Sequence, residues 1–259
     1  MKVPFVNLGL QYQQLREQIL SKFDELSTMG SYILNVEVRE FEENFAQYCG
    51  TRFAIGVGNG SDALFFSLIA LGIGQGDEII TAPNSFIATA WAIANVGAKP
   101  VFVDADDRYQ IDCNKIEKKI TKKTKAIMPV HWGGASPIMS KVMKIAKKYN
   151  IHVVEDACMG IGSTINKKSP GTFGIVNAFS MHPLKSLNVM GDGGILSTND
   201  KILAKWIQKY RNHGMINRDN IEFWGVNMRM QPLQAIVADI GLNKIDKVIR
   251  QRNLNAKKL

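Results

Sequence analysis

The sequence has few cysteines, and they are not arranged for disulfide or metal chemistry. Cys49, Cys113 and Cys158 are the three cysteines among 259 residues, and no two of them form a CxxC pair. An odd, scattered set of this kind argues against a disulfide framework and against a structural zinc site. We therefore expect a reducing compartment, the cytoplasm, and no bound metal.

The chain also lacks a segment typical of secreted or membrane proteins. Its first 18 residues contain no apolar signal-peptide core. The longest uncharged stretch, residues 79–98, has the length of a bilayer span, but Pro83, Asn84 and Ser85 interrupt it. We interpret this stretch as a strand, a loop and a buried helix, and we expect no membrane partner.

A broad basic face is missing as well, although the formal net charge is +9. Residues 115–125 and 244–259 each carry a net charge of +5, and the rest of the chain is close to neutral. We interpret both runs as solvated side chains on amphipathic helices, with at most a weak attraction for an anionic substrate. Nucleic acid is not an expected partner.

The sequence does contain a regular alternation of short apolar runs and helical patterns. The apolar runs are 53–57, 78–81, 100–104, 125–130, 152–156, 177–181 and 193–198. The helical patterns between the first five runs lie at 61–72, 85–97, near 113–120 (Lys-rich) and at 138–150. This alternation predicts an α/β fold with three layers, α/β/α, around a mostly parallel sheet. Ligands of such sheets bind beyond the carboxyl ends of the strands.

The two ends of the chain differ from this alternating core. Residues 10–27 and 36–48 have helical patterns, and the segment after Pro232 is helical and amphipathic up to the last residue. We expect this last helix to be continuous, because it contains no capping glycine and no proline stop.

Four groups of residues could carry chemistry. The segment VGNGSDAL at 57–64 joins a strand to a helix and suits an anion, with a plain turn as the roughly equal alternative. Asp156 ends a buried strand, where it could cap a helix or pair with a protonated ring nitrogen of a cofactor. Lys185 lies in a glycine-flanked loop, where it could form a Schiff base or remain a solvated charge. His131 follows a strand and could approach a substrate or be an ordinary hydrogen-bonded histidine.

The anion turn, the strand-end Asp and the loop Lys, in this order, resemble a fold-type I pyridoxal-phosphate (PLP) enzyme. More narrowly, the chain resembles the sugar aminotransferases of the DegT/DnrJ/EryC1/StrS family. The resemblance runs nearly end to end and includes the blocks VPFVNLGLQY, GVGNGSDAL, KAIMPVHWGG, VVEDA, FSMHPLK, GDGG, RNHG and NMRMQPLQA. It implies an aspartate aminotransferase-like large domain.

The resemblance implies catalytic roles for Lys185 and Asp156, which also bind the cofactor, and a cofactor-binding role for Phe86. Lys185 matches the lysine that binds the cofactor covalently and moves the substrate proton. Asp156 matches the carboxylate that pairs with the pyridine nitrogen and keeps the ring an electron sink. Phe86 matches an aromatic side chain stacked on that ring.

The resemblance also implies residues that bind the cofactor phosphate. Gly60, Ser61 and Ser180 match positions that surround the phosphate. Asn227 matches an asparagine that reaches the phosphate in the neighbouring subunit, which implies a homodimer with shared active sites.

The chain departs from the family pattern at three places. Met159 stands where a Gln or His commonly contacts the ring hydroxyl, and Asn35 stands where glycine is usual. We expect the C-terminal small domain of the family to be missing from this chain. We therefore expect an N-terminal arm at 1–35, a PLP-binding domain at 36–240, and the start of a connecting helix at 241–259. We expect little or no turnover from this chain by itself.

The implied function is a PLP-dependent aminotransferase. Its substrates would be a keto group on a nucleotide-activated deoxysugar and an amino-acid donor, glutamate, in polysaccharide biosynthesis. The alternatives are a PLP-dependent sugar dehydratase or other fold-type I lyase, a regulatory paralogue, and a catalytically impaired fragment. A dehydrating branch of the family has histidine at the position of Lys185, and a pure scaffold needs neither Lys185 nor Asp156.

Overall fold

The computed structural model of the chain describes residue 4 and residues 6–258. Residues 1–3 and 5 of the expected N-terminal arm, and Leu259 of the expected connecting helix, lie outside the described residues. Seven strands form one sheet in the order β1-β7-β6-β5-β4-β2-β3. Their bounds are β1 Phe53–Val57, β2 Glu78–Thr81, β3 Lys99–Phe102, β4 Thr124–Ile127, β5 His152–Asp156, β6 Val176–Ser180 and β7 Gly194–Thr198.

The sheet is mostly parallel, as the alternating pattern predicts. Only β7 runs against its neighbours, and it pairs antiparallel with both β1 and β6. Gly194 at the start of β7 is opposite Val57 on one side and Ser180 on the other. The link from β6 to β7 holds no helix, because antiparallel neighbours need no crossover.

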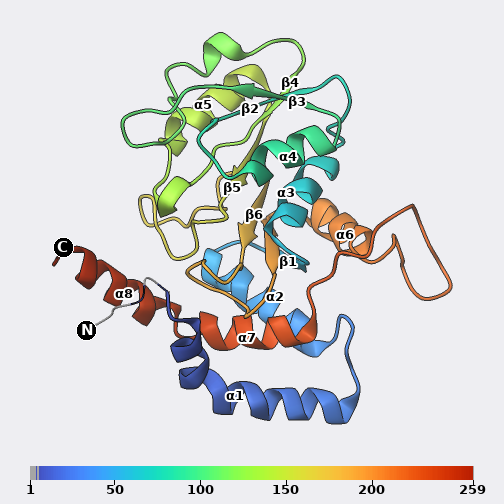
Figure 1. Cartoon of the computed structure of the whole chain (residues 1–259). Coiled ribbons are helices and arrows are strands. Elements are labelled where there is room, and N and C mark those ends of the chain that lie inside the picture. The colour runs from blue at the N-terminus through green and yellow to red at the C-terminus, as the bar shows by residue number, and fades with distance from the viewer. Residues whose placement is uncertain (1–3, 5, 259) are drawn as a thin grey trace.

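Helices cover both faces of the sheet and give the expected three layers (Figure 1). One face packs against α3 (Gly60–Ile69), α4 (Ile87–Asn95) and α6 (Lys201–Tyr210). The other face packs against α2 (Val36–Cys49), α5 (Met139–Tyr149) and α7 (Pro232–Leu242). Successive strand residues alternate between these two cores, as with Ala178 and Phe179 in β6.

The two ends of the chain lie on the same side of this sandwich. The helix α1 (Leu8–Met29) packs on α7 through Leu15, Ile19 and Val237, and α8 (Ile245–Ala256) extends away from α7 (Figure 1). No described helix is both long enough and apolar enough to cross a bilayer.

Two helices differ from the expectations. The Lys-rich segment near 113–120 forms only a single 3-10 turn, η1 (Glu117–Lys119). Closely spaced lysines repel one another on a helix, and the segment instead packs on α5 through the fully buried Ile116. The helix expected after Pro232 breaks at 243–244 into α7 and α8.

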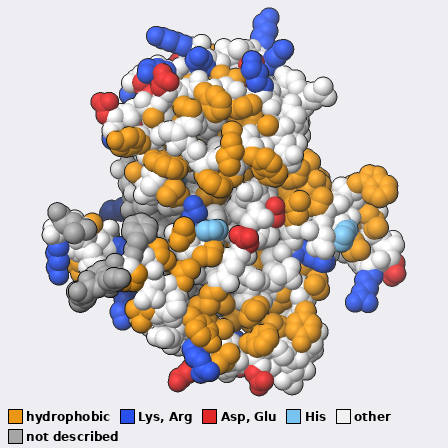
Figure 2. Space-filling model, viewed as in Figure 1, with side chains coloured by type: hydrophobic (Ala, Val, Ile, Leu, Met, Phe, Trp, Pro, Cys, Tyr) orange, Lys and Arg blue, Asp and Glu red, His pale blue; other side chains and the backbone are white. Residues whose placement is uncertain are grey.

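Lysines of α5 and of the Lys-rich segment occupy one end of the molecule, where Lys and Arg side chains gather in Figure 2. Lys148 forms an exposed ion pair with Glu117 at 2.5 Å, and Lys141 donates to the side chain of Asn114 at 3.2 Å. The six lysines of the run 115–125 are themselves all exposed, which agrees with the interpretation of this run as solvated charge.

Candidate active site

Gly60 meets the carboxyl end of β6, next to the end of β5. Gly60 begins α3, and Ser180 ends β6. A Cβ built on Gly60 would lie 2.6 Å from the Cβ of Ser180 and 3.2 Å from the Sγ of Cys158. This contact brings the anion turn next to the strands that carry Asp156 and lead to Lys185.

Asp156 is the last residue of β5, and it is 4% exposed. Its Oδ2 accepts a hydrogen bond of 2.6 Å from the hydroxyl of Thr89, and its Oδ1 accepts one of 3.2 Å from the backbone N–H of Cys158. The segment directly after β5 forms turns and not a helix. Asp156 therefore does not have the helix-capping role that the sequence left open. Both donors are neutral groups, which leaves its negative charge without a cationic partner among the described residues.

The first turn of α4 contributes two side chains to the site. Phe86 is the N-cap residue of α4 and is 70% exposed, which leaves its ring free to cover a planar ligand. Thr89 lies one turn later and is 2% exposed, and its hydroxyl bonds Asp156 on one side and Ser85 at 2.7 Å on the other. One helical turn thus places an aromatic face and a carboxylate-orienting hydroxyl together.

The start of α3 has the features of an anion site. The Asn59 side chain accepts from the N–H of Asp62 at 2.9 Å, and the Asn59 carbonyl accepts from the N–H of Ala63 at 3.1 Å. Within the described part of the chain, the N–H groups of Gly60 and Ser61 have no acceptor. Free N–H groups at a helix start, with the Ser180 hydroxyl nearby, suit a phosphate.

Burial changes the pKa of Asp62, an acidic residue in the first turn of α3. Asp62 is 9% exposed, and burial raises its pKa to about 6, the negative charge of Asp192 acting in the same direction and hydrogen bonds from Asn59 opposing it. A more easily protonated carboxyl close to an anion site reduces repulsion of the anion.

Lys185 lies in the link between β6 and β7, and hydrogen bonds shape that loop. The N–H of Lys185 donates to the carbonyl of His182 at 2.8 Å, and the N–H of Leu184 donates to the His182 Nδ1 at 3.2 Å. From outside the loop, Gln11 of α1 accepts from the Asn188 side chain at 3.0 Å. His182 therefore helps to shape the turn that presents Lys185.

The charges of Lys185 and Asp156 both affect the pKa of Cys158. Burial raises the pKa of the Cys158 thiol well above its ordinary value, the negative charge of Asp156 raises it further, and the positive charge of Lys185 opposes the shift. The charges of Asp156 and Lys185 thus both affect the same thiol, two residues after Asp156.

These residues fit PLP. A buried carboxylate without a cationic partner is costly, and a protonated ring nitrogen would compensate it. The exposed Phe86 ring suits a planar ring, and the free N–H groups of Gly60 and Ser61 suit a phosphate. In contrast, no group of three or more potential metal ligands occurs within the described residues.

Three residues singled out from the sequence lie at the edge of this arrangement. Asn227 is exposed and forms a backbone bridge with Asn212, and no described hydrogen bond joins it to the site. Met159 is 38% exposed in the turn after β5. Asn35 is the N-cap of α2 with φ −88°, so its backbone does not require glycine.

The His131 side chain is not exposed to solvent. It is fully buried, and its ring bonds Glu155 and Ser136, each at 2.8 Å. Of the two roles that the sequence left open, the structure has the hydrogen-bonded one.

The sequence analysis missed two contacts at the end of β5. Thr89 follows Phe86 by three residues, so helical periodicity alone could have placed them on one face of α4. The bond between His131 and Glu155 carries no such local signal, because it joins the segment after β4 to the strand β5.

Comparison with known proteins agrees with this geometry. The model of the DegT/DnrJ/EryC1/StrS aminotransferase family matches residues 13–259. The chain is 42% identical to a dTDP-3-amino-3,6-dideoxy-alpha-D-galactopyranose transaminase of Aneurinibacillus thermoaerophilus, over 94% of this chain and 68% of that protein. It is 39% identical to a pleiotropic regulatory protein of Geobacillus stearothermophilus, over 99% of this chain and 69% of that protein.

A solved structure gives the same result. DesV of S. venezuelae superimposes with a TM-score of 0.92 at 37% identity, over 95% of this chain and 67% of DesV. The chain thus spans about two thirds of the length of these relatives. The chain belongs to the DegT/DnrJ/EryC1/StrS aminotransferase family.

Proposed function

We propose that this chain is a PLP-dependent aminotransferase that transfers nitrogen to a keto group of a nucleotide-activated sugar. The observation that carries the proposal is the buried carboxylate of Asp156, which accepts hydrogen bonds from neutral donors only. In the proposed complex this carboxylate holds a protonated ring nitrogen, and the amine of Lys185 reaches the cofactor aldehyde. The PLP dependence of the family, and relatives named as sugar transaminases, support the same function.

The chain's own residues divide the work of binding and proton transfer. When bound, PLP supplies an electron sink for cleavage of a carbon–hydrogen bond. Asp156 holds the ring nitrogen, Phe86 covers one face of the ring, and the N–H groups of Gly60 and Ser61 with the Ser180 hydroxyl bind the phosphate.

Lys185 is the base and the acid of the reaction. Its Nζ accepts the proton from the α-carbon of the amino-acid donor, for which we propose glutamate. In the second half-reaction the same Nζ returns a proton to the sugar carbon that receives the nitrogen.

The active form we propose is a homodimer. The loop between α6 and α7 projects from the molecule (Figure 1) and exposes the apolar residues Ile216, Ile221 and Trp224, the last at 95%. Large apolar side chains exposed on one loop are typical of an interface. Asn227 follows Trp224 by three residues, so a dimer formed there would bring Asn227 towards the partner.

The proposed function also includes the extent of the cofactor-binding unit, the compartment and the use of the product. Residues 36–240 would form the cofactor-binding unit. Three free cysteines suit a cytoplasmic enzyme, and an amino sugar made there would serve polysaccharide synthesis.

The direct test is the attachment of the cofactor. The wild-type chain incubated with PLP should gain a visible absorbance band, and borohydride should then attach the cofactor covalently to Lys185, as identified by peptide mapping. Lys185→Ala should lose the band and the label. A label on a different lysine in the wild-type chain would rule out this assignment.

A further inference from the structure

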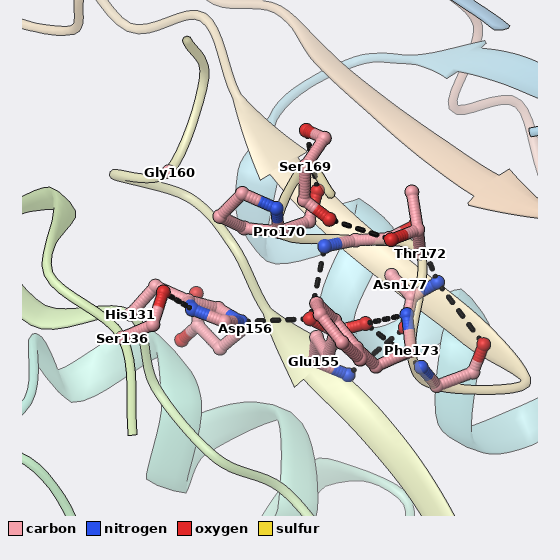
Figure 3. Close-up of polar contacts among 12 residues, drawn as sticks. His131, Ser136, Glu155, Asp156, Gly160, Ser169, Pro170, Thr172, Phe173 and Asn177 are labelled. Carbon is pink, nitrogen blue, oxygen red and sulfur yellow. Dashed lines mark hydrogen bonds and ion pairs between the residues drawn. The ribbon is translucent and has the colours of Figure 1, made fainter. Parts of the chain in front are cut away.

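A cluster of buried polar groups lies directly behind Asp156 (Figure 3). We call it the Glu155 cluster; it consists of Glu155, His131 and Ser136 with the backbone N–H groups of Gly171, Phe173 and Gly174. Glu155 and His131 are both fully buried. Burial of an ionisable pair is costly, so the cluster needs a physical account.

The acceptor capacity of Glu155 is filled. Its Oε2 accepts from His131 Nε2 at 2.8 Å and from Gly171 N–H at 2.9 Å. Its Oε1 accepts from Phe173 N–H at 2.7 Å and from Gly174 N–H at 2.8 Å. Four donors match the four lone-pair sites of a carboxylate, so loss of any one donor leaves a buried acceptor unsatisfied.

His131 is held in one orientation by its two partners. The carboxylate of Glu155 can only accept, so His131 Nε2 carries a proton and donates it. The other ring nitrogen, Nδ1, bonds the Ser136 hydroxyl at 2.8 Å. Figure 3 shows the His131 ring between Ser136 and Glu155.

The backbone of His131 is bonded directly to the backbone of Asp156. The N–H of His131 donates to the carbonyl of Asp156 at 3.0 Å, and the N–H of Asp156 donates to the carbonyl of Pro129 at 3.0 Å. Thus the peptide groups on both sides of Asp156 are bonded to the segment that carries His131. The His131 side chain, in turn, bonds the residue that precedes Asp156.

The two residues at the end of β5, Glu155 and Asp156, have different partners on the two faces of the sheet. Side chains alternate along a strand, so Glu155 and Asp156 point to opposite faces of the sheet. On one face Asp156 meets Thr89, and on the other Glu155 ties β5 to the segment 171–174 and to His131. The direction of the Asp156 carboxylate therefore depends on how firmly the opposite face is fixed.

We propose that His131 is a positioning residue for Asp156, acting through Glu155 and through its own backbone N–H. This inference rests on the proposed function, in which Asp156 holds the ring nitrogen of PLP. Carboxylates in such sites must be held within about 0.5 Å of the productive position, and the Glu155 cluster provides the support.

The test compares three variants of the 259-residue chain. His131→Leu removes both ring bonds, whereas His131→Gln retains an amide N–H that can reach Glu155. Ile207→Ala is the matched control, because Ile207 is fully buried in α6 and its truncation leaves a cavity away from the cluster. Each variant is titrated with PLP and followed by absorbance, and its thermal midpoint is measured without PLP.

We expect His131→Leu and Ile207→Ala to lower the thermal midpoint, and only His131→Leu to weaken PLP binding, by about tenfold. His131→Gln should stay within about threefold of the wild type, because it retains the donor to Glu155. Equal PLP affinity in His131→Leu and Ile207→Ala would overturn the proposal, since His131 would then be merely structural.

A second measurement separates this inference from the proposed function. Amide hydrogen exchange without PLP should be faster in His131→Leu than in Ile207→Ala at residues 155–157 and 171–174. If the wild type binds no PLP, the proposed function fails, and unchanged exchange at these residues refutes the positioning role as well. If His131→Leu does not fold, Ser136→Ala takes its place, with faster exchange expected at the same residues and unchanged exchange overturning the proposal.

Discussion

The hydroxyl of Thr89 donates a hydrogen bond of 2.6 Å to Oδ2 of Asp156, which lies 67 residues further along the chain. Both groups are buried, so this bond is not exchanged for one to water. A hydrogen bond to a buried carboxylate stabilises the charged form and fixes its orientation.

The first prediction concerns this bond. Thr89→Val keeps the shape of the side chain and removes the donor, so PLP affinity should fall by about tenfold. Thr89→Ser keeps the hydroxyl and should remain close to the wild type. Absorbance titration with PLP gives both affinities, and wild-type affinity in Thr89→Val would show that the bond does not orient Asp156 for the cofactor.

The second prediction concerns the close approach of Gly60 to β6. In Gly60→Ala the new methyl group would lie 2.6 Å from the Cβ of Ser180, so α3 or β6 must shift. We expect the free energy of unfolding to fall by about 1–3 kcal/mol. Urea denaturation measures the change.

A matched control for Gly60 is available in α1. A Cβ on Gly9 would meet no atom closer than 3.7 Å, so Gly9→Ala should change the free energy of unfolding by less than about 0.5 kcal/mol. Similar losses in the two variants would show that the contact with Ser180 is not the cause.

The third prediction concerns the pH dependence contributed by Asp62. Its carboxyl ionises near pH 6 in the folded chain and near its ordinary pKa of about 4 in the unfolded chain. Between these values the folded protein holds more protons, so this residue makes the free energy of unfolding fall as the pH rises.

Asp62→Asn removes this contribution. The wild type should therefore lose stability relative to Asp62→Asn as the pH rises from about 4 to about 6, and the difference should become constant above that range. Thermal midpoints of the two proteins across pH 4–8 provide the measurement. A difference that grows in the opposite direction would mean that the folded state favours the ionised carboxyl.

The fourth prediction distinguishes amino transfer from dehydration. With glutamate labelled with nitrogen-15 and a keto-sugar nucleotide, a transferase moves the label into the sugar, whereas a dehydratase leaves the sugar without nitrogen. Because Lys185 can both bind the cofactor and move a proton, we expect the sugar product of whatever slow turnover this chain supports to carry the label, detected by mass spectrometry. A product with less oxygen and no label would establish the dehydratase alternative.

Most of the fold could be predicted from the sequence because its signals are local. Near-continuous apolar runs mark β1 to β7 to within a few residues, and β7 needed no crossover helix because of its glycine-rich link. The prediction of a helix in the Lys-rich segment was wrong, because charge repulsion and the burial of Ile116 against α5 decide the shape of this segment. The sequence around residues 243–244 also lacks a local pattern strong enough to predict the break between α7 and α8.

The chemistry of the site divides in the same way. The sequence pattern predicts that Asp156 ends a strand and that Lys185 lies in a glycine-flanked loop, as the structure has them, whereas their roles were implied only by the resemblance to the family. The Thr89–Asp156 bond, the Gly60–Ser180 contact and the His131–Glu155 pair were decided only by the tertiary structure. Each joins separate elements, and hydrogen bonds and van der Waals contacts depend on distances that the packing of those elements sets.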